Sequence, residues 1–176
     1  MEVLRRFDYG LTKFIQSRSP AWQPVMAGVS FLGHPTVVLL LGFVGFVSAA
    51  QRGQTDIQIQ RAFLYGALAY SLNTVLKLAL RRRRPHNLQI SFLGLRSYSF
   101  PSGHAFGTVI FYGLFSYLDY TFLPQPYNAL LALMLWALIL LIGVSRIYLK
   151  AHYPSDVVGG WLLGSLSLLI IINLAF

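Results

Sequence analysis

Long apolar blocks, separated by short polar connections, make up most of the chain. Four of them contain no Asp, Glu, Lys or Arg, and they are residues 62–76, 105–118, 127–145 and 157–176. A helix of about 20 apolar residues crosses the hydrocarbon core of a bilayer, so the blocks predict membrane spans. We place these spans at 58–81, 103–122, 127–147 and 154–175. The alternative, a very hydrophobic soluble helical protein, is disfavoured by these lengths.

The N-terminal segment has a different pattern. Residues 3–17 place apolar side chains at helical spacing with charged ones between them: Val3, Leu4, Phe7, Leu11, Phe14 and Ile15 against Arg5, Arg6, Asp8 and Lys13. This pattern is typical of an amphipathic helix on the membrane surface. The scattered charges leave no apolar core of a signal peptide, so we expect no cleavage here.

A further apolar stretch, residues 23–50, is interrupted by Gly33-His34-Pro35. It is either one kinked span or a short half-inserted helix followed by a span from about Pro35, and we favour the second. The pattern as a whole predicts an all-α, polytopic transmembrane helix bundle with about five to six membrane segments and an N-terminal amphipathic surface helix. No linker divides the chain, so we expect a single membrane-embedded domain over residues 1–176.

Composition agrees with this interpretation. Hydrophobic residues make up 56% of the chain and charged residues 11%, with a mean hydropathy of +0.60. The net charge of +9 comes from basic residues at the ends of the apolar blocks. Anionic lipid headgroups or a phosphorylated substrate are therefore better partners than nucleic acid. The chain has no Cys, which excludes disulfides and thiolate chemistry.

Polar residues of unusual type gather where four spans meet one face of the membrane. Because successive spans alternate in direction, the end of the span at 58–81 shares a face with the start of 103–122, the end of 127–147 and the start of 154–175. The long connection 82–101 lies on the same face, and long loops often carry function. We therefore expect the functional site there.

Lys77 and Arg84 are seven residues apart, which is two helical turns. They project from one face if the helix continues to Arg84 and Pro85 ends it. Lys77 lies in an otherwise apolar segment, where an unpaired ammonium is costly and a dianionic phosphate would compensate it. The arginines at 81–84 also suit a cationic anchor at a span end, a role that we give to two or three of them, including Arg82.

Pro101-Ser102-Gly103-His104 leads directly into an apolar helix. Ser102 is a suitable N-cap, and the free amides after it form an anion site. Gly103 allows close approach of the backbone to an oxyanion, and His104 can donate a proton at the membrane surface. Taken alone, these residues are more often ordinary helix capping.

Ser145-Arg146 is followed by His152 and, four residues later, by Asp156. A carboxylate at this spacing is within reach of the histidine Nδ1–H, which would fix the tautomer and leave Nε2 free to attack. Considered separately, Asp156 also suits a helix start and His152 an interfacial position. Three cations, helix-start amides, two histidines and one carboxylate on one face together indicate phosphoryl transfer.

The segments KLALRRRRP (77–85), PSGH (101–104) and SRIYLKAHYPSD (145–156) resemble, in order and spacing, the three motifs of the type-2 phosphatidic acid phosphatase superfamily. The resemblance implies phosphate binding by five residues: Lys77, Arg84, Ser102, Gly103 and Arg146. It also implies catalysis by three residues: His152 as nucleophile, His104 as general acid and Asp156 as the partner of His152. Members of the superfamily hydrolyse phosphate or diphosphate esters of membrane lipids through a phosphohistidine and without a metal, so we expect no cofactor.

Other functions fit these residues less well. A metal held by His104 and His152 is disfavoured, because one carboxylate among many Arg and Lys residues would repel a cation. A lipid phosphotransferase on the same scaffold is the alternative, and a non-catalytic lipid-binding or transport protein is a remote one. Vanadium haloperoxidases resemble the superfamily in the same three motifs, but the predicted membrane spans argue against that function. Phosphatidic acid, phosphatidylglycerol phosphate, a polyprenyl diphosphate and a lipid A phosphate all present the expected group.

Three further features of the sequence give weaker indications of function. His34 and His86 are interpreted as interfacial or loop residues, not as ligands. Gly160 and Gly164 form a G-x-x-x-G pattern that is typical of close helix packing.

Charge gives conflicting indications about sidedness. If the surface helix lies on the site face, eleven basic residues do so: Arg5, Arg6, Lys13, Arg18, Arg81, Arg82, Arg83, Arg84, Arg96, Arg146 and Lys150. The other face has Arg52 and Arg61, so the positive-inside rule favours a cytoplasmic site. The family resemblance implies an outward-facing one. We expect a multi-pass protein of the inner (plasma) membrane with an extracytoplasmic site, because several of these charges belong to the site.

Overall fold

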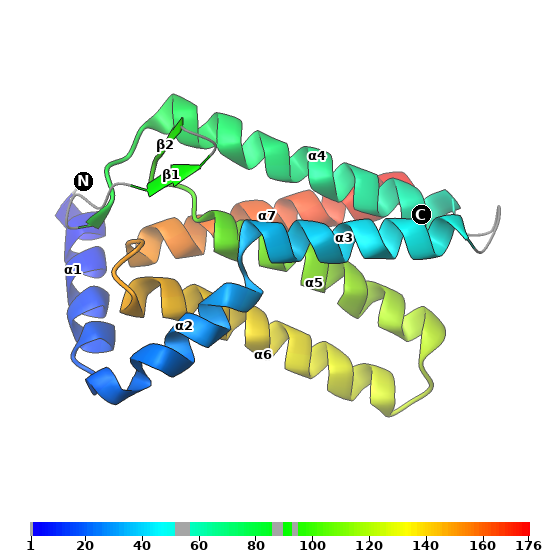
Figure 1. Cartoon of the computed structure of the whole chain (residues 1–176), viewed down its shortest axis with the longest axis horizontal. Helices are drawn as coiled ribbons and strands as arrows, with labels where there is room; N and C mark the ends of the chain where they lie inside the picture. The colour runs from blue at the N-terminus through cyan, green and yellow to red at the C-terminus, as the bar shows by residue number, and fades with distance from the viewer. Residues whose placement is uncertain (1, 52–56, 86–89, 93–94) are drawn as a thin grey trace.

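Long helices lie side by side along one axis and carry most of the described chain (Figure 1). The structure is a computed structural model that describes residues 2–51, 57–85, 90–92 and 95–176. Its elements are α1 (Glu2–Gln16), the 3-10 turn η1 (Pro20–Trp22), α2 (Gln23–Leu32), α3 (Pro35–Ala50), α4 (Ile57–Leu80), β1 (Ile90–Phe92), β2 (Leu95–Ser97), α5 (Gly103–Phe122), α6 (Tyr127–Tyr148) and α7 (Pro154–Ala175). The predicted all-α helix bundle is confirmed, and the four predicted spans begin and end within one residue of α4, α5, α6 and α7.

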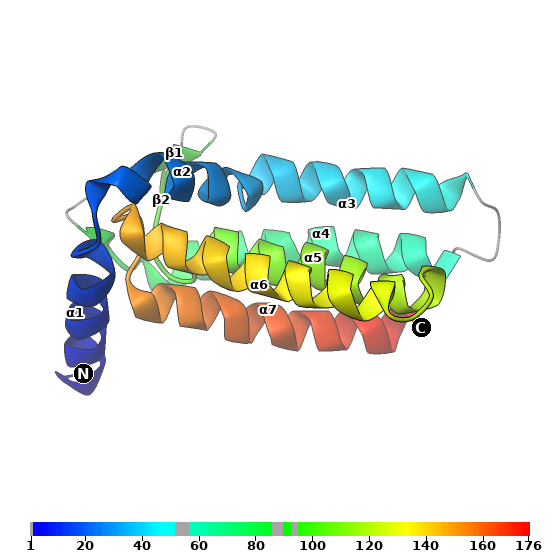
Figure 2. The ribbon, with the colours of Figure 1, turned by 90° about the horizontal axis from the view of Figure 1, so that it is seen from below.

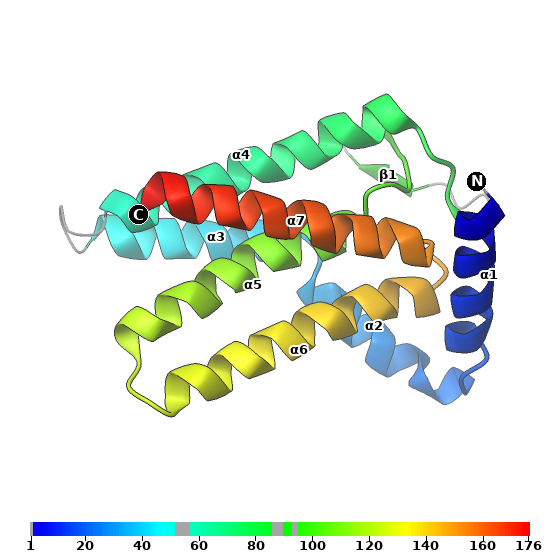
Figure 3. The same ribbon diagram turned by 180° about the vertical axis from the view of Figure 1, so that it is seen from behind.

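Helix α5 forms the interior of the bundle and contacts α3, α4, α6 and α7 (Figure 3). Its side chains Phe106, Ile110 and Leu114 are almost completely buried. Gly160 and Gly164 let α7 lie against α5, because a Cβ on either glycine would come within 3.0 Å of an α5 or Ser102 carbonyl oxygen. The packing role predicted for these two glycines is confirmed.

The outward surfaces of the bundle are apolar. Leu68, Leu133 and Leu162, one from each of α4, α6 and α7, are at least 60% exposed. Four segments of the described chain are long and apolar enough to cross a bilayer: Pro20–Ala50, Ile57–Leu80, Tyr127–Tyr148 and Pro154–Ala175. Exposed leucines on such helices are compatible with lipid as the surrounding solvent, since lipid tails are as apolar as leucine.

The stretch at 23–50 divides into two helices, as favoured from the sequence. α2 ends at Leu32, and α3 begins at Pro35 after a break at Gly33 and His34 (Figure 2). The His34 Nδ1 accepts a hydrogen bond from the Thr36 N–H at 3.3 Å, so His34 caps α3. This is a structural role in the connection and agrees with the predicted one. His86 lies outside the described residues.

Helix α1 lies across one end of the bundle, roughly perpendicular to the long helices (Figures 1 and 2). It contacts α6 and α7, and the Gln16 side chain donates a hydrogen bond to the Ile147 carbonyl at 2.9 Å. Val3, Phe7 and Phe14 are exposed. The predicted amphipathic helix is therefore present, and it lies at the end of the bundle where the spans predicted the site.

The connection between α4 and α5 contains two strands that the sequence analysis did not predict. β1 and β2 pair antiparallel, with Ile90 opposite Ser97. The chain leaving β2 then runs past the end of α4 and into α5 (Figure 1). This return path brings residues 97–101 to the site.

Candidate active site

The Lys77 and Arg84 side chains meet at the segment that follows β2, and not on a continuous helix. α4 ends at Leu80, and Arg81 takes a left-handed conformation with φ of 48°. Its N–H bonds the Lys77 carbonyl at 3.0 Å, which is a common way for a helix to end. The helix thus ends within one residue of the predicted boundary at 81, and the condition that it continues to Arg84 is not met. Lys77 Nζ and Arg84 Nη2 both donate to the Tyr98 carbonyl, at 3.1 and 3.3 Å, so that carbonyl brings the two cations together.

Backbone carbonyls hold both cations in place. Lys77 also donates to the Pro101 carbonyl at 2.5 Å. Arg84, which is 7% exposed, donates to the Ser97 and Ala151 carbonyls, each at 3.0 Å. Burial lowers the pKa of Arg84, and the nearby Asp156 carboxylate opposes that shift. An arginine remains charged under such a shift, so a buried cation is fixed at this point.

His152 is 2% exposed and its Nε2 lies 3.1 Å from Arg84 Nη1. A guanidinium has only donors, so Nε2 accepts and the neutral imidazole carries its proton on Nδ1. Burial lowers the pKa of His152 to about 3; the nearby Asp156 carboxylate opposes this shift, and the charges of Lys77, Arg84 and Arg146 add to it. A neutral imidazole whose Nε2 lone pair is free of a proton has the form needed for nucleophilic attack.

The loop between α6 and His152 is held by hydrogen bonds to one backbone carbonyl. The Arg146 carbonyl accepts hydrogen bonds from the Ala151 and His152 N–H groups at 3.0 and 3.3 Å. Lys150 takes a left-handed conformation with φ of 60°, which turns the chain back toward α6. The five residues between Arg146 and His152 therefore place the imidazole beside the end of its own preceding helix.

Asp156 is fully buried and lies beside the His152 imidazole. Its Oδ2 is 3.6 Å from His152 Nδ1, just beyond hydrogen-bond distance, and it accepts hydrogen bonds from the Tyr153 N–H at 2.9 Å and from the Ser99 hydroxyl. The Ser102 N–H donates to the Asp156 carbonyl at 2.9 Å. The carboxylate thus accepts from Tyr153, at the start of its own helix, and from Ser99, in the loop before α5, while the Ser102 N–H holds the backbone carbonyl of the same residue.

Arg82 has a different position from the one predicted. Its Nη1 donates to Asp156 Oδ1 and its Nη2 to Asp8 Oδ2, both at 2.7 Å. The interpretation of Arg82 as a membrane anchor is wrong, because both ends of its guanidinium are paired inside the protein. Arg83 is exposed and fits that role.

The PSGH segment packs against α4. Ser102 is fully buried, and its Oγ accepts from the Ala105 N–H at 3.5 Å, as expected of an N-cap. A Cβ on Gly103 would meet the Tyr70 hydroxyl at 3.1 Å and the Lys77 side chain at 3.7 Å. The start of α5 therefore lies next to the Lys77 side chain, an arrangement that favours binding of an anion.

His104 and Arg146 complete the cluster. The His104 ring lies edge-on to the His34 ring, with 5.8 Å between centroids. Arg146 Nη1 donates to the Ser30 hydroxyl at 2.5 Å, while its buried Nε has no partner among the described residues. All eight site residues predicted from the sequence therefore lie at one end of the bundle.

Several residues at this site were not predicted as part of it. Asp8, Ser99 and Ser155 contact Arg82 or Asp156, and the Ser97 and Tyr98 carbonyls hold Arg84. Serines and backbone carbonyls give no specific signal in one sequence. A carboxylate within the otherwise basic segment 3–13 was the available signal for Asp8. Within the described residues, no group of three or more His, Cys, Asp or Glu is placed to hold a metal ion.

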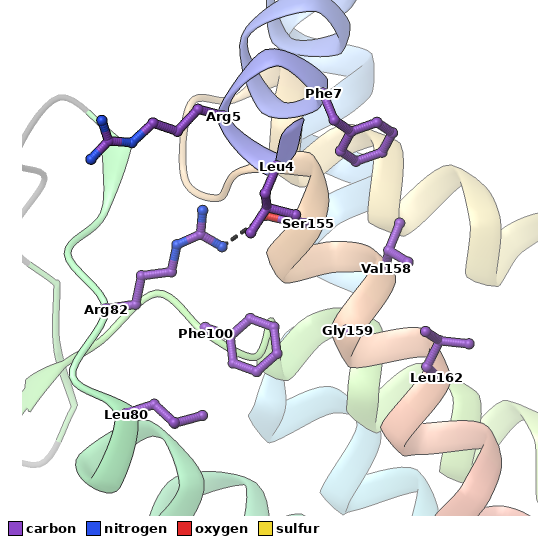
Figure 4. A pocket seen from close by; sticks show the side chains of 10 residues that line it. All are labelled: Leu4, Arg5, Phe7, Leu80, Arg82, Phe100, Ser155, Val158, Gly159 and Leu162. Atoms are coloured by element: carbon purple, nitrogen blue, oxygen red, sulfur yellow. Dashed lines mark hydrogen bonds between the residues drawn. The ribbon is translucent and has the colours of Figure 1, made fainter. Parts of the chain in front are cut away.

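An apolar pocket of about 670 Å³ opens beside this cluster (Figure 4). Its lining comes from α1, the end of α4, the loop before α5 and the first turns of α7, and comprises Leu4, Arg5, Phe7, Leu80, Arg82, Phe100, Ser155, Val158, Gly159 and Leu162. Arg82 and Ser155 therefore face both the pocket and the buried carboxylates.

Comparisons with known proteins show the family to which the chain is similar. A family model described as the PAP2 superfamily matches residues 60–176. Phosphatidylglycerophosphatase B of Bacillus subtilis is 30% identical over 152 residues, covering 85% of this chain and 73% of that protein. Lipid A 1-phosphatase of Rhizobium etli is 33% identical over 113 residues, covering 58% of this chain and 45% of that protein. The match therefore spans less than half the length of the second relative.

Solved structures give the same result. The crystal structure of a PAP2-type phosphatidylglycerolphosphate phosphatase from Bacillus subtilis is similar with a TM-score of 0.84 and 26% identity, covering 99% of this chain and 87% of that one. The structure of Aquifex aeolicus LpxE gives a TM-score of 0.70 at 24% identity, with 94% of each chain covered, and it supports the fold alone.

Proposed function

The chain belongs to the PAP2 superfamily, and we propose that it is a multi-pass membrane lipid phosphatase that works through a covalent phosphohistidine on His152. One observation carries the mechanism: the Arg84 guanidinium, which can only donate hydrogen bonds, contacts His152 Nε2. This contact supports a neutral imidazole whose Nε2 lone pair faces a cluster of cations. A phosphate bound by those cations would lie against the nucleophile.

The proposed chemistry has two steps. Nε2 attacks phosphorus, the bond from phosphorus to the lipid oxygen breaks, and His104 gives its proton to that oxygen. Water then attacks the phosphohistidine, His104 accepts its proton, and inorganic phosphate leaves as Nε2 is restored. The five phosphate-binding residues stabilise the charge on the equatorial oxygens: Lys77, Arg84, Ser102, Gly103 and Arg146. Asp156 holds the Nδ1 side of His152 and favours the positive imidazole that forms.

The substrate is a membrane lipid that carries a phosphate or diphosphate, and we propose that residues 1–176 act as one domain on it. The similarity to phosphatidylglycerophosphatase B makes phosphatidylglycerol phosphate the first lipid to test. Purified protein is expected to release inorganic phosphate from at least one of four lipids: phosphatidylglycerol phosphate, phosphatidic acid, a polyprenyl diphosphate and a lipid A phosphate. Release that requires a second lipid as acceptor would instead indicate a phosphotransferase.

The proposed mechanism uses no metal. Phosphate release is expected to be unchanged in EDTA, because protein cations and amides replace the usual Mg²⁺. Vanadate is expected to inhibit, since it forms a five-coordinate mimic of the transferring phosphoryl group. Activity that disappears on chelation and returns with Mg²⁺ or Zn²⁺ would contradict this proposal.

We propose that the site faces the outside of the inner membrane. The absence of Cys allows a direct test with single-cysteine variants. Lys13→Cys lies on exposed α1 at the site end, and Gln125→Cys lies in the exposed connection between α5 and α6. A membrane-impermeant maleimide is expected to label Lys13→Cys in whole cells and Gln125→Cys only after permeabilisation. The opposite pattern would place the site in the cytoplasm, as the positive-inside rule favours.

A further inference from the structure

We infer that Asp8 is a positioning residue for the proposed hydrolysis: from the surface helix α1 it holds Arg82 and Ser155 against Asp156, the carboxylate beside His152. The inference rests on the proposed function. Asp8 lies on a different element from every motif residue, and it contacts none of the reacting groups proposed above.

Asp8 differs from the rest of its helix in burial. It is the one buried residue of α1, with 7% of its surface exposed. A buried carboxylate is costly unless it is paired and hydrogen-bonded, so its position needs specific partners. Glu2 on the same helix provides the contrast, because its side chain is 78% exposed and pairs with Arg6 at the surface.

The partners of Asp8 belong to the start of α7. Oδ1 accepts the Ser155 N–H at 2.9 Å, and Oδ2 accepts the Ser155 hydroxyl at 2.8 Å. Ser155 is the second residue of α7, where amides have no partner within the helix. Asp8 thus caps, from another helix, the turn that carries Asp156.

Arg82 extends this contact to the site. Its guanidinium donates to Asp8 Oδ2 through Nη2, and to Asp156 Oδ1 and Ser155 Oγ through Nη1, each at 2.7 Å. Figure 4 shows Arg82 reaching Ser155 beneath α1. The Ser155 hydroxyl donates a hydrogen bond to Asp8 and accepts one from Arg82, so it links the two side chains with consistent donor and acceptor roles. Asp156 Oδ1 is therefore fixed from the α1 side, while Oδ2 faces His152 Nδ1 at 3.6 Å.

The first test is Asp8→Asn, with Glu2→Gln as the matched control that removes one carboxylate from the same helix. Asp8→Asn is expected to lower kcat on the order of 10-fold with KM nearly unchanged, since coupled residues in one network interact on this scale. Glu2→Gln is expected to behave as the wild type. A rise in KM at unchanged kcat would overturn the inference, as would a fall in kcat that merely follows the unfolded fraction measured by thermal denaturation in detergent.

A double-mutant cycle distinguishes positioning from general stability. In an Asp156→Asn background, Asp8→Asn is expected to lower kcat by less than about twofold, because its route to His152 is already broken. The same factor in both backgrounds would show that Asp8 does not act through Asp156.

A measurement without substrate separates this inference from the proposed function. In protein labelled with ¹⁵N-histidine, Asp8→Asn is expected to shift the His152 ring signals, and Glu2→Gln to leave them in place. Unshifted signals would overturn the inference even if activity fell. If the wild-type protein hydrolyses no lipid phosphate, the proposed function fails, and this measurement still decides the role of Asp8.

Discussion

His152→Ala is expected to abolish phosphate release from every substrate, whereas His104→Ala is expected to fail mainly on substrates with a poor leaving group. His152 attacks phosphorus in the proposed mechanism, so nothing about the leaving group can replace it. His104 protonates the departing oxygen, a contribution typically of about 10²–10⁴. A lipid alkoxide needs that proton, and a p-nitrophenolate hardly needs it.

The measurement compares both variants on a lipid phosphate and on p-nitrophenyl phosphate. His104→Ala is expected to lose most activity on the lipid and to keep far more on the aryl ester. Asp156→Asn provides an internal control, because it is expected to be severe but incomplete: it weakens the hold on the tautomer and leaves the nucleophile present. Turnover of the lipid by His152→Ala, or rescue of His152→Ala by the aryl ester, would mean that the roles of the two histidines are reversed.

The spans were predictable because their signal is local. An apolar block long enough to cross a bilayer has few other uses, and α4, α5, α6 and α7 match the predicted ranges within one residue. The break at Gly33 and Pro35 was also readable, because both residue types disfavour a continuous helix. The alternation of spans then placed PSGH, Arg146 and His152 at the same end of the bundle.

The proximity of the Lys77 and Arg84 side chains was predicted for the wrong reason. Helical spacing put them on one face, but α4 ends at Leu80. What brings them together is the Tyr98 carbonyl, in the segment that returns after β2. Such a contact depends on the path of the long connection between Leu80 and Gly103, which no periodicity encodes.

Arg82 and Asp8 show a second limit. In sequence, Arg82 is one of four consecutive arginines and Asp8 is a charge on an amphipathic helix, so both are expected to face water or lipid headgroups. Their pairing crosses 74 positions and depends on how α1 docks on α7. One sequence contains no signal for such a docking geometry, so it had to come from the structure.

Lys77→Ala and Arg84→Ala are each expected to lower kcat/KM by at least ~10², because in the proposed mechanism each removes a cation that stabilises the transferring phosphoryl group. Arg83→Ala is the matched control, since Arg83 is adjacent in sequence but exposed. It removes the same charge from the same cluster and is expected to leave kcat/KM nearly unchanged.

The two losses are expected to differ in origin. Arg84 also contacts His152 Nε2, so Arg84→Ala removes both the proposed phosphate ligand and the donor that keeps Nε2 deprotonated and oriented. Within the part of the chain that the structure describes, Lys77 donates hydrogen bonds to the carbonyls of Tyr98 and Pro101 and to no atom of His152, so Lys77→Ala removes a charge without removing a hydrogen bond to the nucleophile. Arg84→Lys is therefore expected to recover little activity, because an ammonium cannot reproduce the planar fork that joins Ser97, Ala151 and His152. Equal damage from Lys77→Ala, Arg83→Ala and Arg84→Ala, measured with folded protein, would mean that the cations act as a diffuse positive patch and bind no phosphate individually.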